Sequence, residues 1–224
     1  MITVYKVAEE DAAPHPLAVR DVAAQLKAGG LALLPTETVY GVGVAVAAYQ
    51  RCAEVPAPAT GYGRIFALKQ RDLAQTVPWL VSGPEALDAY GIDIDPGTRV
   101  LAEKFWPGAL TLIVKAAPCV PAFMRAADGT VALRASASPV IQALVAACAS
   151  PLAVTSANTH GAPAPAAFSD VEPRILEGVD VAVDAGATSC RDASTIVSVV
   201  GGVPRIIRQG ALPAEAICEA LASC

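Results

Sequence analysis

Histidine, aromatic residues and charged residues are all scarce in this sequence of 224 residues. Aromatic residues make up 5% of the chain, charged residues make up 17%, and His15 and His160 are the two histidines. Neither histidine lies near a cysteine pair, the arrangement typical of a structural zinc site, and neither has a credible nucleophile partner for a Ser-His-Asp hydrolase. We therefore expect no protein-bound metal site and no such triad.

Long uninterrupted apolar runs are missing as well, although hydrophobic residues make up 54% of the chain and its mean hydropathy is +0.48. Residues 135–169 contain no Lys, Arg, Asp or Glu, but four prolines interrupt them. A membrane-spanning helix needs about 20 consecutive apolar residues, so we expect no membrane span. The composition instead favours a large core of Ala, Val, Leu and Ile.

The first residues show no basic region followed by an apolar one, which is the pattern of a secretory signal. The six cysteines are scattered and form no CxxC pair. In a reducing compartment, such cysteines are most simply free thiols. The sequence therefore predicts a cytoplasmic protein.

The familiar phosphate-binding signatures are also absent. Gly41-Val42-Gly43 lacks the third glycine of a dinucleotide fingerprint, and there is no GxxxxGK[ST] segment. The net charge of −5 argues against a broad footprint on the phosphate backbone of a nucleic acid. A small anionic ligand held by a few cations remains compatible with this charge.

Apolar runs and helical periodicities are interleaved along the chain, and several of the expected strands are consecutive. This pattern favours one α/β domain over residues 1–224, with a twisted mixed sheet and flanking helices, over a strictly parallel doubly wound sheet. Helices are expected at residues 17–27, 83–90, 96–105, 139–148 and 213–222. Strands are expected at residues 2–7, 31–34, 64–68, 110–115, 130–134, 152–155, 179–183, 195–200 and 204–208.

Polar side chains follow four of these expected strands, and strand ends are favoured ligand sites in open α/β sheets. Thr36 and Thr38 are two residues apart, as are Lys69 and Arg71, so each pair would point to one side of an extended chain. Arg134 follows a third strand. Ser156 and Asn158 follow a fourth. Taken singly, each cluster is compatible with a turn or a solvated strand end, and Trp106 with core packing.

Seven segments in this order resemble the YrdC-like threonylcarbamoyl-AMP synthases. They are Pro35-Thr36-Glu37-Thr38-Val39-Tyr40-Gly41, Lys69-x-Arg71, Phe105-Trp106-Pro107-Gly108-x-Leu110-Thr111, Arg134, Ser156-Ala157-Asn158, Ser194-Thr195-Ile196-Val197 and Arg208-x-Gly210-Ala211. The resemblance implies the short, single-domain form, with a concave cavity. It also implies synthesis of threonylcarbamoyl-AMP and pyrophosphate from L-threonine, bicarbonate or CO2, and ATP, with Mg²⁺ accompanying ATP. The product would pass to a transferase complex that modifies tRNA.

The resemblance also implies roles for individual residues. Lys69 and Arg71 would be the catalytic cations. The residues implied to bind ATP are Lys69, Arg71, Thr38, Ser156, Asn158 and Arg208. Thr36, Arg134 and Ser194 would bind threonine or its carbamate. Cations and hydroxyls suit this chemistry because the carboxylate, the carbamate and the triphosphate are all anionic.

The chain departs from the family pattern on the amino-acid side. The segment after Arg71 carries Trp79 and no histidine, and Ser136 and Ser138 stand where the family has proline and histidine. If Trp79 faces inward, it narrows the amino-acid pocket. Two other functions stay open: a divergent paralogue that makes or uses another carbamoyl-adenylate, and a non-catalytic RNA- or nucleotide-binding module, which the acidic charge disfavours.

Overall fold

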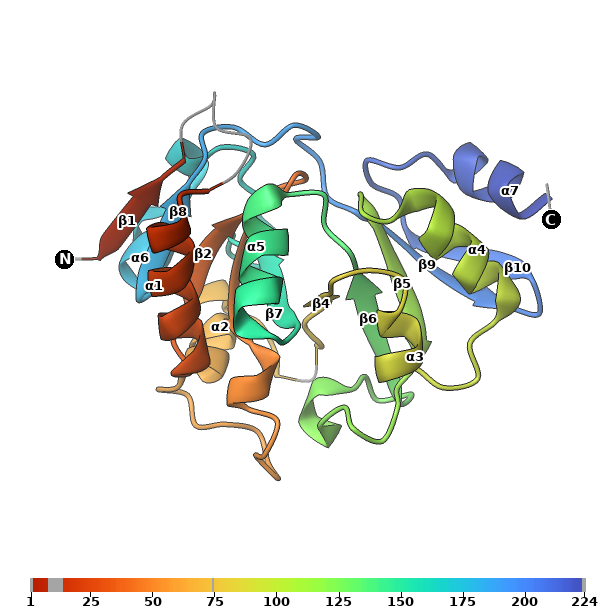
Figure 1. Cartoon of the computed structure of the whole chain (residues 1–224), viewed down its shortest axis with the longest axis horizontal. Coiled ribbons are helices and arrows are strands. Elements are labelled where there is room, and N and C mark those ends of the chain that lie inside the picture. Colours follow the sequence, from red (N-terminus) through yellow and green to blue (C-terminus); the bar gives the residue numbers. More distant parts are fainter. Residues whose placement is uncertain (1, 8–13, 74, 223–224) are drawn as a thin grey trace.

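The computed structural model describes residues 2–7, 14–73 and 75–222. These residues form a ten-stranded sheet with the order β1-β8-β2-β3-β7-β4-β6-β5-β9-β10, flanked by helices (Figure 1). The strands are β1 (Thr3–Lys6), β2 (Ala32–Pro35), β3 (Tyr40–Ala45), β4 (Trp79–Leu80), β5 (Leu110–Lys115), β6 (Thr130–Arg134), β7 (Leu152–Ser156), β8 (Val181–Asp184), β9 (Thr195–Val200) and β10 (Val203–Arg208). The helices are α1 (Pro16–Lys27), α2 (Gly61–Lys69), α3 (Ala86–Tyr90), α4 (Pro96–Phe105), α5 (Pro139–Cys148), α6 (Pro173–Glu177) and α7 (Ala214–Ala222).

The sheet mixes parallel and antiparallel pairs. Strand β8 pairs parallel with both β1 and β2, whereas β3 pairs antiparallel with both β2 and β7. In the other half, β5 pairs antiparallel with β6 and parallel with β9. The mixed α/β sheet expected from the sequence is confirmed.

Helices cover the sheet from both sides, because alternate strand residues point to opposite faces. Helices α1 and α5 pack on one face, where Leu26 and Leu144 belong to the same buried cluster as Leu34 of β2. Helix α2 lies behind that half of the sheet (Figure 1), and its Ile65 joins a second cluster with Leu33 of β2. Helices α4 and α7 contact each other and cover β5, β9 and β10.

Two helices have the bounds that the sequence predicted, and each begins with proline, which is favoured at the first helical position. Helix α4 starts at Pro96 after Asp95, whose carboxylate accepts a hydrogen bond from the Gly97 N–H at 2.8 Å. Helix α5 starts at Pro139 and ends before Ala149, which has a φ of 49° in the left-handed region. Local capping chemistry therefore fixed these two elements.

The strand predicted at residues 64–68 is wrong: this segment belongs to helix α2. The hydroxyl of Thr60 accepts a hydrogen bond from the Gly63 N–H at 3.2 Å and caps the helix, which ends before Gln70 at a φ of 50°. A short apolar run cannot distinguish a buried strand from a buried helix. Gly61 allows the close approach, because a Cβ there would lie 2.4 Å from the Gly29 carbonyl oxygen.

Strands β3 and β4 and helix α6 were not predicted. Strand β3 contains Gly41 and Gly43, which lower strand propensity but are needed here because a Cβ at either position would lie 2.5 Å from the Val154 side chain of β7. The glycine pair is thus a packing feature between β3 and β7.

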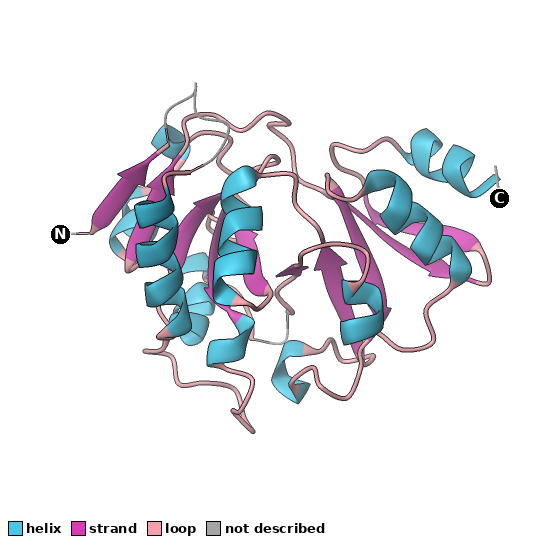
Figure 2. Ribbon diagram, viewed as in Figure 1, coloured by secondary structure: helices cyan, strands magenta, loops and turns pink. Residues whose placement is uncertain are grey.

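The loop between β8 and β9 crosses the upper edge of the molecule and links its two halves (Figure 2). In the described ranges, no helix has the length and apolar character needed to span a membrane. Five cysteines are free thiols, and Cys224 lies outside the described residues.

Candidate functional site

Strand ends from both halves of the sheet meet around a small cavity of about 90 Å³. Its wall combines the turn after β2, the end of β6, the end of β7, and the start of β9 with the end of β10. Six of the nine predicted site residues line it: Thr36, Thr38, Arg134, Ser156, Ser194 and Arg208. Residues that are up to 172 positions apart in the sequence therefore line one cavity.

The first wall is a tight hydroxyl turn. The Thr36 hydroxyl oxygen accepts hydrogen bonds from the N–H groups of Thr38 and Val39, both at 3.1 Å, and donates to the Val39 carbonyl oxygen at 2.6 Å. It also lies 2.8 Å from the Thr38 hydroxyl oxygen. Because Thr36 uses its single proton on Val39, Thr38 is the donor in that pair. The sequence pattern of two hydroxyls side by side is thus explained by the turn itself.

Lys69 lies beside the cavity and is almost fully buried. Its ammonium donates to the carbonyl oxygens of Ser156 and Asn158 at 2.5 and 2.9 Å, and to the Asn158 Oδ1 at 3.0 Å. Burial, reinforced by the Arg71 charge and opposed by Glu172, lowers the pKa of Lys69 to about 8. The ammonium thereby fixes the end of β7 and the turn after it.

Arg71 follows the left-handed residue Gln70 and contacts Thr155, another β7 residue that lines the cavity. Its guanidinium donates to the Thr155 hydroxyl at 3.2 Å and to the Thr76 carbonyl oxygen at 2.7 Å. Burial lowers the pKa of Arg71 from its usual value. The expectation that Lys69 and Arg71 lie on an extended chain is wrong, because Lys69 is the last residue of helix α2. Both cations nevertheless contact residues of β7.

Asn158 also lies behind the wall. Its Oδ1 accepts a hydrogen bond from the Ser156 hydroxyl at 2.6 Å, and its amide nitrogen donates to the Ala162 carbonyl oxygen at 2.5 Å. Of the three predicted site residues that do not line the cavity, Lys69 and Asn158 therefore act on Ser156, and Arg71 acts on Thr155.

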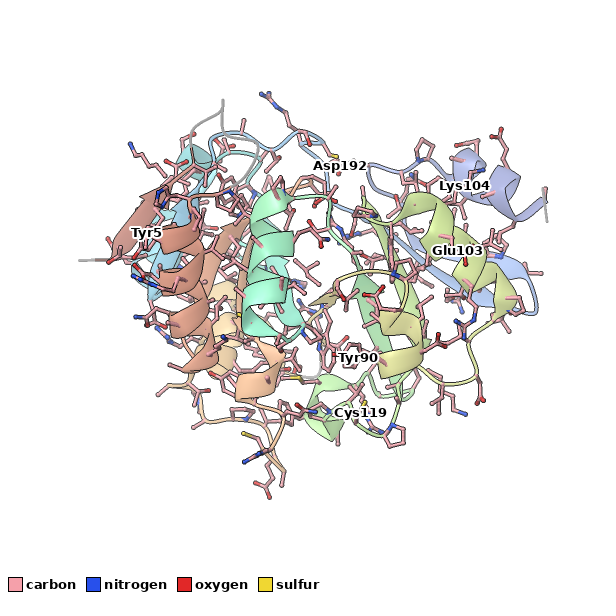
Figure 3. The ribbon with its side chains drawn as sticks, viewed as in Figure 1. Tyr5, Tyr90, Glu103, Lys104, Cys119 and Asp192 are labelled. Carbon is pink, nitrogen blue, oxygen red and sulfur yellow. The ribbon has the colours of Figure 1, made fainter. Side chains whose placement is uncertain are left out.

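The opposite wall carries Arg134 and Arg208. The Arg134 guanidinium pairs with the Glu37 carboxylate at 2.6 Å, and its Nε donates to the Gly108 carbonyl oxygen at 3.0 Å. Arg208 donates to the Ser194 carbonyl oxygen at 2.6 Å. Burial and the nearby Arg134 charge lower the pKa of Arg208, while Asp192, labelled in Figure 3 on the β8–β9 loop, opposes this shift.

Three further residues of the site belong to the segments that the sequence singled out, although no role was predicted for them. Thr111 and Thr155 line the cavity, and Thr111 lies within a hydrogen bond of Ser194, with 2.8 Å between their hydroxyl oxygens. Glu37 lies on the turn between the two predicted threonines and holds Arg134. Their positions at strand ends were the available signal, but nothing in the sequence showed which side chains converge.

A larger cavity of about 530 Å³ adjoins the first and shares Thr36 and Tyr40 with it. Its wall is mostly apolar and includes residues from the start of α5 and from the β8–β9 loop. Thr188 of this loop donates its hydroxyl to the Thr38 carbonyl oxygen at 2.8 Å. The loop therefore closes both cavities on one side.

The three residues that depart from the family pattern, Ser136, Ser138 and Trp79, lie in different surroundings. Ser138 lines the larger cavity, and its hydroxyl donates to the Pro35 carbonyl oxygen at 2.8 Å. Ser136 is fully buried, and its hydroxyl donates to Glu37. Trp79 belongs to the hydrophobic core and packs edge-on against Tyr90 with 5.3 Å between ring centroids, whereas its neighbour Leu80 lines the cavity. Trp79 therefore does not narrow the site.

Two proteins have sequences similar to this chain over most of its length. A protein from Mycobacterium leprae (strain TN) is 35% identical over 222 residues, which are 99% of this chain and 94% of that protein. A threonylcarbamoyl-AMP synthase from Alkalilimnicola ehrlichii is 33% identical over 186 residues, 79% of this chain and 92% of that enzyme.

Solved structures show the same architecture. The crystal structure of Pyrococcus abyssi Sua5 complexed with L-threonine superposes with a TM-score of 0.83 at 27% identity, over 97% of this chain and 60% of that one. This chain thus spans 60% of the length of the Pyrococcus protein. The crystal structure of Escherichia coli YciO matches with a TM-score of 0.79 at 19% identity, over 94% of this chain and 96% of that one, and supports the fold alone.

A family model named Sua5_yciO_yrdC and described as "Telomere recombination" matches residues 24–210. That range contains every wall of the small cavity, from the hydroxyl turn after β2 to Arg208 at the end of β10. With sequence relatives above 30% identity over most of the chain and the same sheet in solved structures, this chain belongs to the Sua5/YciO/YrdC family.

Proposed function

We propose that this chain is a threonylcarbamoyl-AMP synthase, a nucleotidyltransferase that forms threonylcarbamoyl-AMP and pyrophosphate from L-threonine, bicarbonate or CO2, and ATP. The observation that carries the proposal is the single cavity lined by Arg134, Arg208, Ser156 and Ser194. The names of relatives and the threonine complex of the Pyrococcus protein support the choice of amino acid.

The proposed chemistry needs positive charge and fixed hydroxyl donors. The threonine amine and CO2 form a carbamate, whose oxygen attacks the α-phosphorus of ATP while pyrophosphate leaves. Negative charge builds on the phosphoryl oxygens, and preorganised cations lower the free energy of that transition state. We assign Lys69, Arg71 and Arg208 to the phosphate side together with Thr38, Ser156 and Asn158.

We assign Thr36, Arg134 and Ser194 to the carboxylate and carbamate side. The small cavity is tighter than most ligand pockets, which measure about 300–1,000 Å³, so we place only the reacting groups in it. The remainder of ATP would extend past Thr36 and Tyr40 into the larger cavity, or the wall of the small cavity would have to open.

Mg²⁺ would accompany ATP. In the described ranges, no three His, Cys, Asp or Glu side chains gather closely enough to hold a metal ion. Mg²⁺ retains water and is often bound through substrate phosphates, and we propose that it arrives with the nucleotide in this way. It would neutralise phosphate charge. The product would pass to a tRNA threonylcarbamoyl transferase complex in the cytoplasm.

The test is pyrophosphate release from Mg-ATP and bicarbonate, screened across amino acids, with mass detection of the adenylate. We expect release with threonine and none when bicarbonate is omitted. Arg71→Ala should lower the rate about 100-fold, as the loss of one preorganised donor does in other enzymes. Release with another amino acid and not with threonine would favour a divergent paralogue. ATP binding without turnover for any amino acid would favour a binding module.

A further inference from the structure

Glu37 is a largely buried residue, and the two oxygens of its carboxylate contact different side chains. Its Oε1 lies 2.6 Å from Arg134 Nη2, and its Oε2 accepts the hydrogen bond of the Ser136 hydroxyl. The Glu37 and Arg134 side chains are 10% and 7% exposed. Burial acts to raise the pKa of Glu37, but Arg134 and the Ser136 hydroxyl hold that pKa below its usual value. Glu37 therefore stays ionised beside the cavity.

The partners of Glu37 are themselves fixed. The Ser136 hydroxyl oxygen accepts the Ser138 N–H at 3.2 Å, and the Ser136 carbonyl oxygen accepts the Gln142 side-chain amide at 2.7 Å. The Glu37 carbonyl oxygen accepts the Cys190 N–H at 2.8 Å. Backbone contacts thus locate Glu37 from the loop side, and Ser136 orients its carboxylate from the α5 side.

Two contacts hold the Arg134 guanidinium in place. Glu37 holds one terminal nitrogen, and the Gly108 carbonyl oxygen accepts from Nε at 3.0 Å. Gly108 is in turn fixed, because its N–H donates to the Ala135 carbonyl oxygen at 2.7 Å. The Gly108 contact is a hydrogen bond, whereas the Glu37 contact is a close ion pair whose two atoms, Oε1 and Nη2, are buried and lack hydrogen-bond geometry. Charge attraction on one side and the Nε hydrogen bond on the other therefore locate the guanidinium, while Arg134 still lines the cavity.

Stability is a poor explanation for this arrangement. A buried ion pair often contributes no more than well-packed apolar side chains of the same volume would. It also removes net positive charge from a cavity wall that needs to attract anions. Orientation is what the pair supplies, since a planar guanidinium binds a carboxylate through two parallel hydrogen bonds only when it is aligned.

We propose that Glu37, oriented by Ser136, is a positioning residue that holds the Arg134 guanidinium at the angle needed to bind the amino-acid substrate. This inference deepens the proposed function and rests on it. Glu37 also lines the larger cavity, but in this proposal it acts through Arg134 and not on the reacting atoms. It should therefore affect the amino-acid step far more than ATP binding.

The first experiment compares Glu37→Gln, which keeps size and removes the charge, in two backgrounds. In the parent, kcat/KM for threonine should fall about 10–100-fold, by analogy with the loss of a group that orients a metal-binding side chain, with KM for ATP changed less than about twofold. In Arg134→Lys, which keeps the charge but loses the planar fork, Glu37→Gln should add less than about twofold. Equal effects in both backgrounds, or a parallel rise in KM for ATP, would overturn the proposal.

A second readout needs no turnover. In the parent, NMR should show the Arg134 Nη protons in slow rotation about the Cζ–Nε bond, assigned by their loss in Arg134→Lys. Glu37→Gln should bring these signals into fast exchange, and Ser136→Ala should do so in part, whereas Glu85→Gln, a surface control beside Ser82, should change nothing. A parent without turnover would refute the proposed function alone. Slow rotation that persists in Glu37→Gln would refute the positioning role alone.

Discussion

Two cations beside the small cavity are held in opposite ways. Lys69 donates to neutral oxygens of Ser156 and Asn158, and among the described residues no carboxylate lies within salt-bridge distance of it. Arg134 is paired directly with Glu37 at 2.6 Å. Lys69 therefore keeps a net positive charge, whereas the charge of Arg134 is largely cancelled. Lys69 thus supplies electrostatic potential, and Arg134 supplies geometry.

The difference matters because the two substrates make different demands. A triphosphate is drawn by uncompensated positive charge in a poorly solvated site. A single carboxylate or carbamate is recognised by aligned donors. The energetic cost also differs: an unpaired buried cation is destabilising on its own, which the lowered pKa of Lys69 reflects.

The largest effect should come from breaking the ion pair on one side only. Arg134→Met leaves the Glu37 carboxylate buried without a cation, which typically costs about 3–5 kcal/mol of unfolding free energy. Urea denaturation at pH 7 measures this loss. Adding Glu37→Gln should recover at least half of it, and a double variant that is as unstable as the sum of the single ones would contradict the pairing.

Lys69→Met should cost less in stability and more in catalysis. It leaves the Ser156 and Asn158 oxygens without their donor, at about 1–3 kcal/mol, and part of this is offset because the buried charge disappears. Pyrophosphate release should fall about 100-fold or more. Lys69→Arg serves as the matched control that keeps the charge. If Lys69→Met retains parental turnover, the assignment of electrostatic potential to this side is wrong.

The pH dependence of the two sides should also differ. The pKa of Lys69 is lowered from 10.5 to about 8 in the folded chain. Between pH 8 and 10.5 the unfolded chain binds the extra proton, so this group should make unfolding free energy rise with pH there. Turnover should instead fall above pH 8 as the ammonium is lost. A pH–rate profile of the parent beside Lys69→Arg, whose charge persists, tests this, and identical profiles would assign the fall to another group.

The smallest effect should be on amino-acid choice. We still expect threonine to bind more weakly, or serine to be rejected less well, than in relatives that carry proline and histidine where this chain has Ser136 and Ser138. Trp79 should not contribute, because it packs in the core. Trp79→Phe should therefore leave the threonine-to-serine ratio of kcat/KM within about twofold, and a larger shift would place Trp79 nearer the substrate than its core contacts allow.

Much of the fold was readable from local signals. Pro96 and Pro139 mark the starts of α4 and α5, and apolar runs identified β5, β6 and β9 with their bounds. The segment at 64–68 failed because a short apolar run fits either a strand or a helix. Strand β3 was missed because its glycines, which accommodate Val154, lower its propensity. Tertiary contact overrode local preference in both cases.

The sequence by itself determined the class of fold, the family resemblance and six of the sixteen residues that line the small cavity, because motif identity and strand-end placement are local properties. Only the tertiary structure decided which side chains meet. It placed Lys69, Asn158 and Arg71 behind the wall and Trp79 in the core. It also joined Glu37 to Arg134 and Ser136, about 100 residues away in the sequence. Burial and hydrogen-bond partners depend on how distant strands are ordered in the sheet, and no spacing along the chain encodes that order.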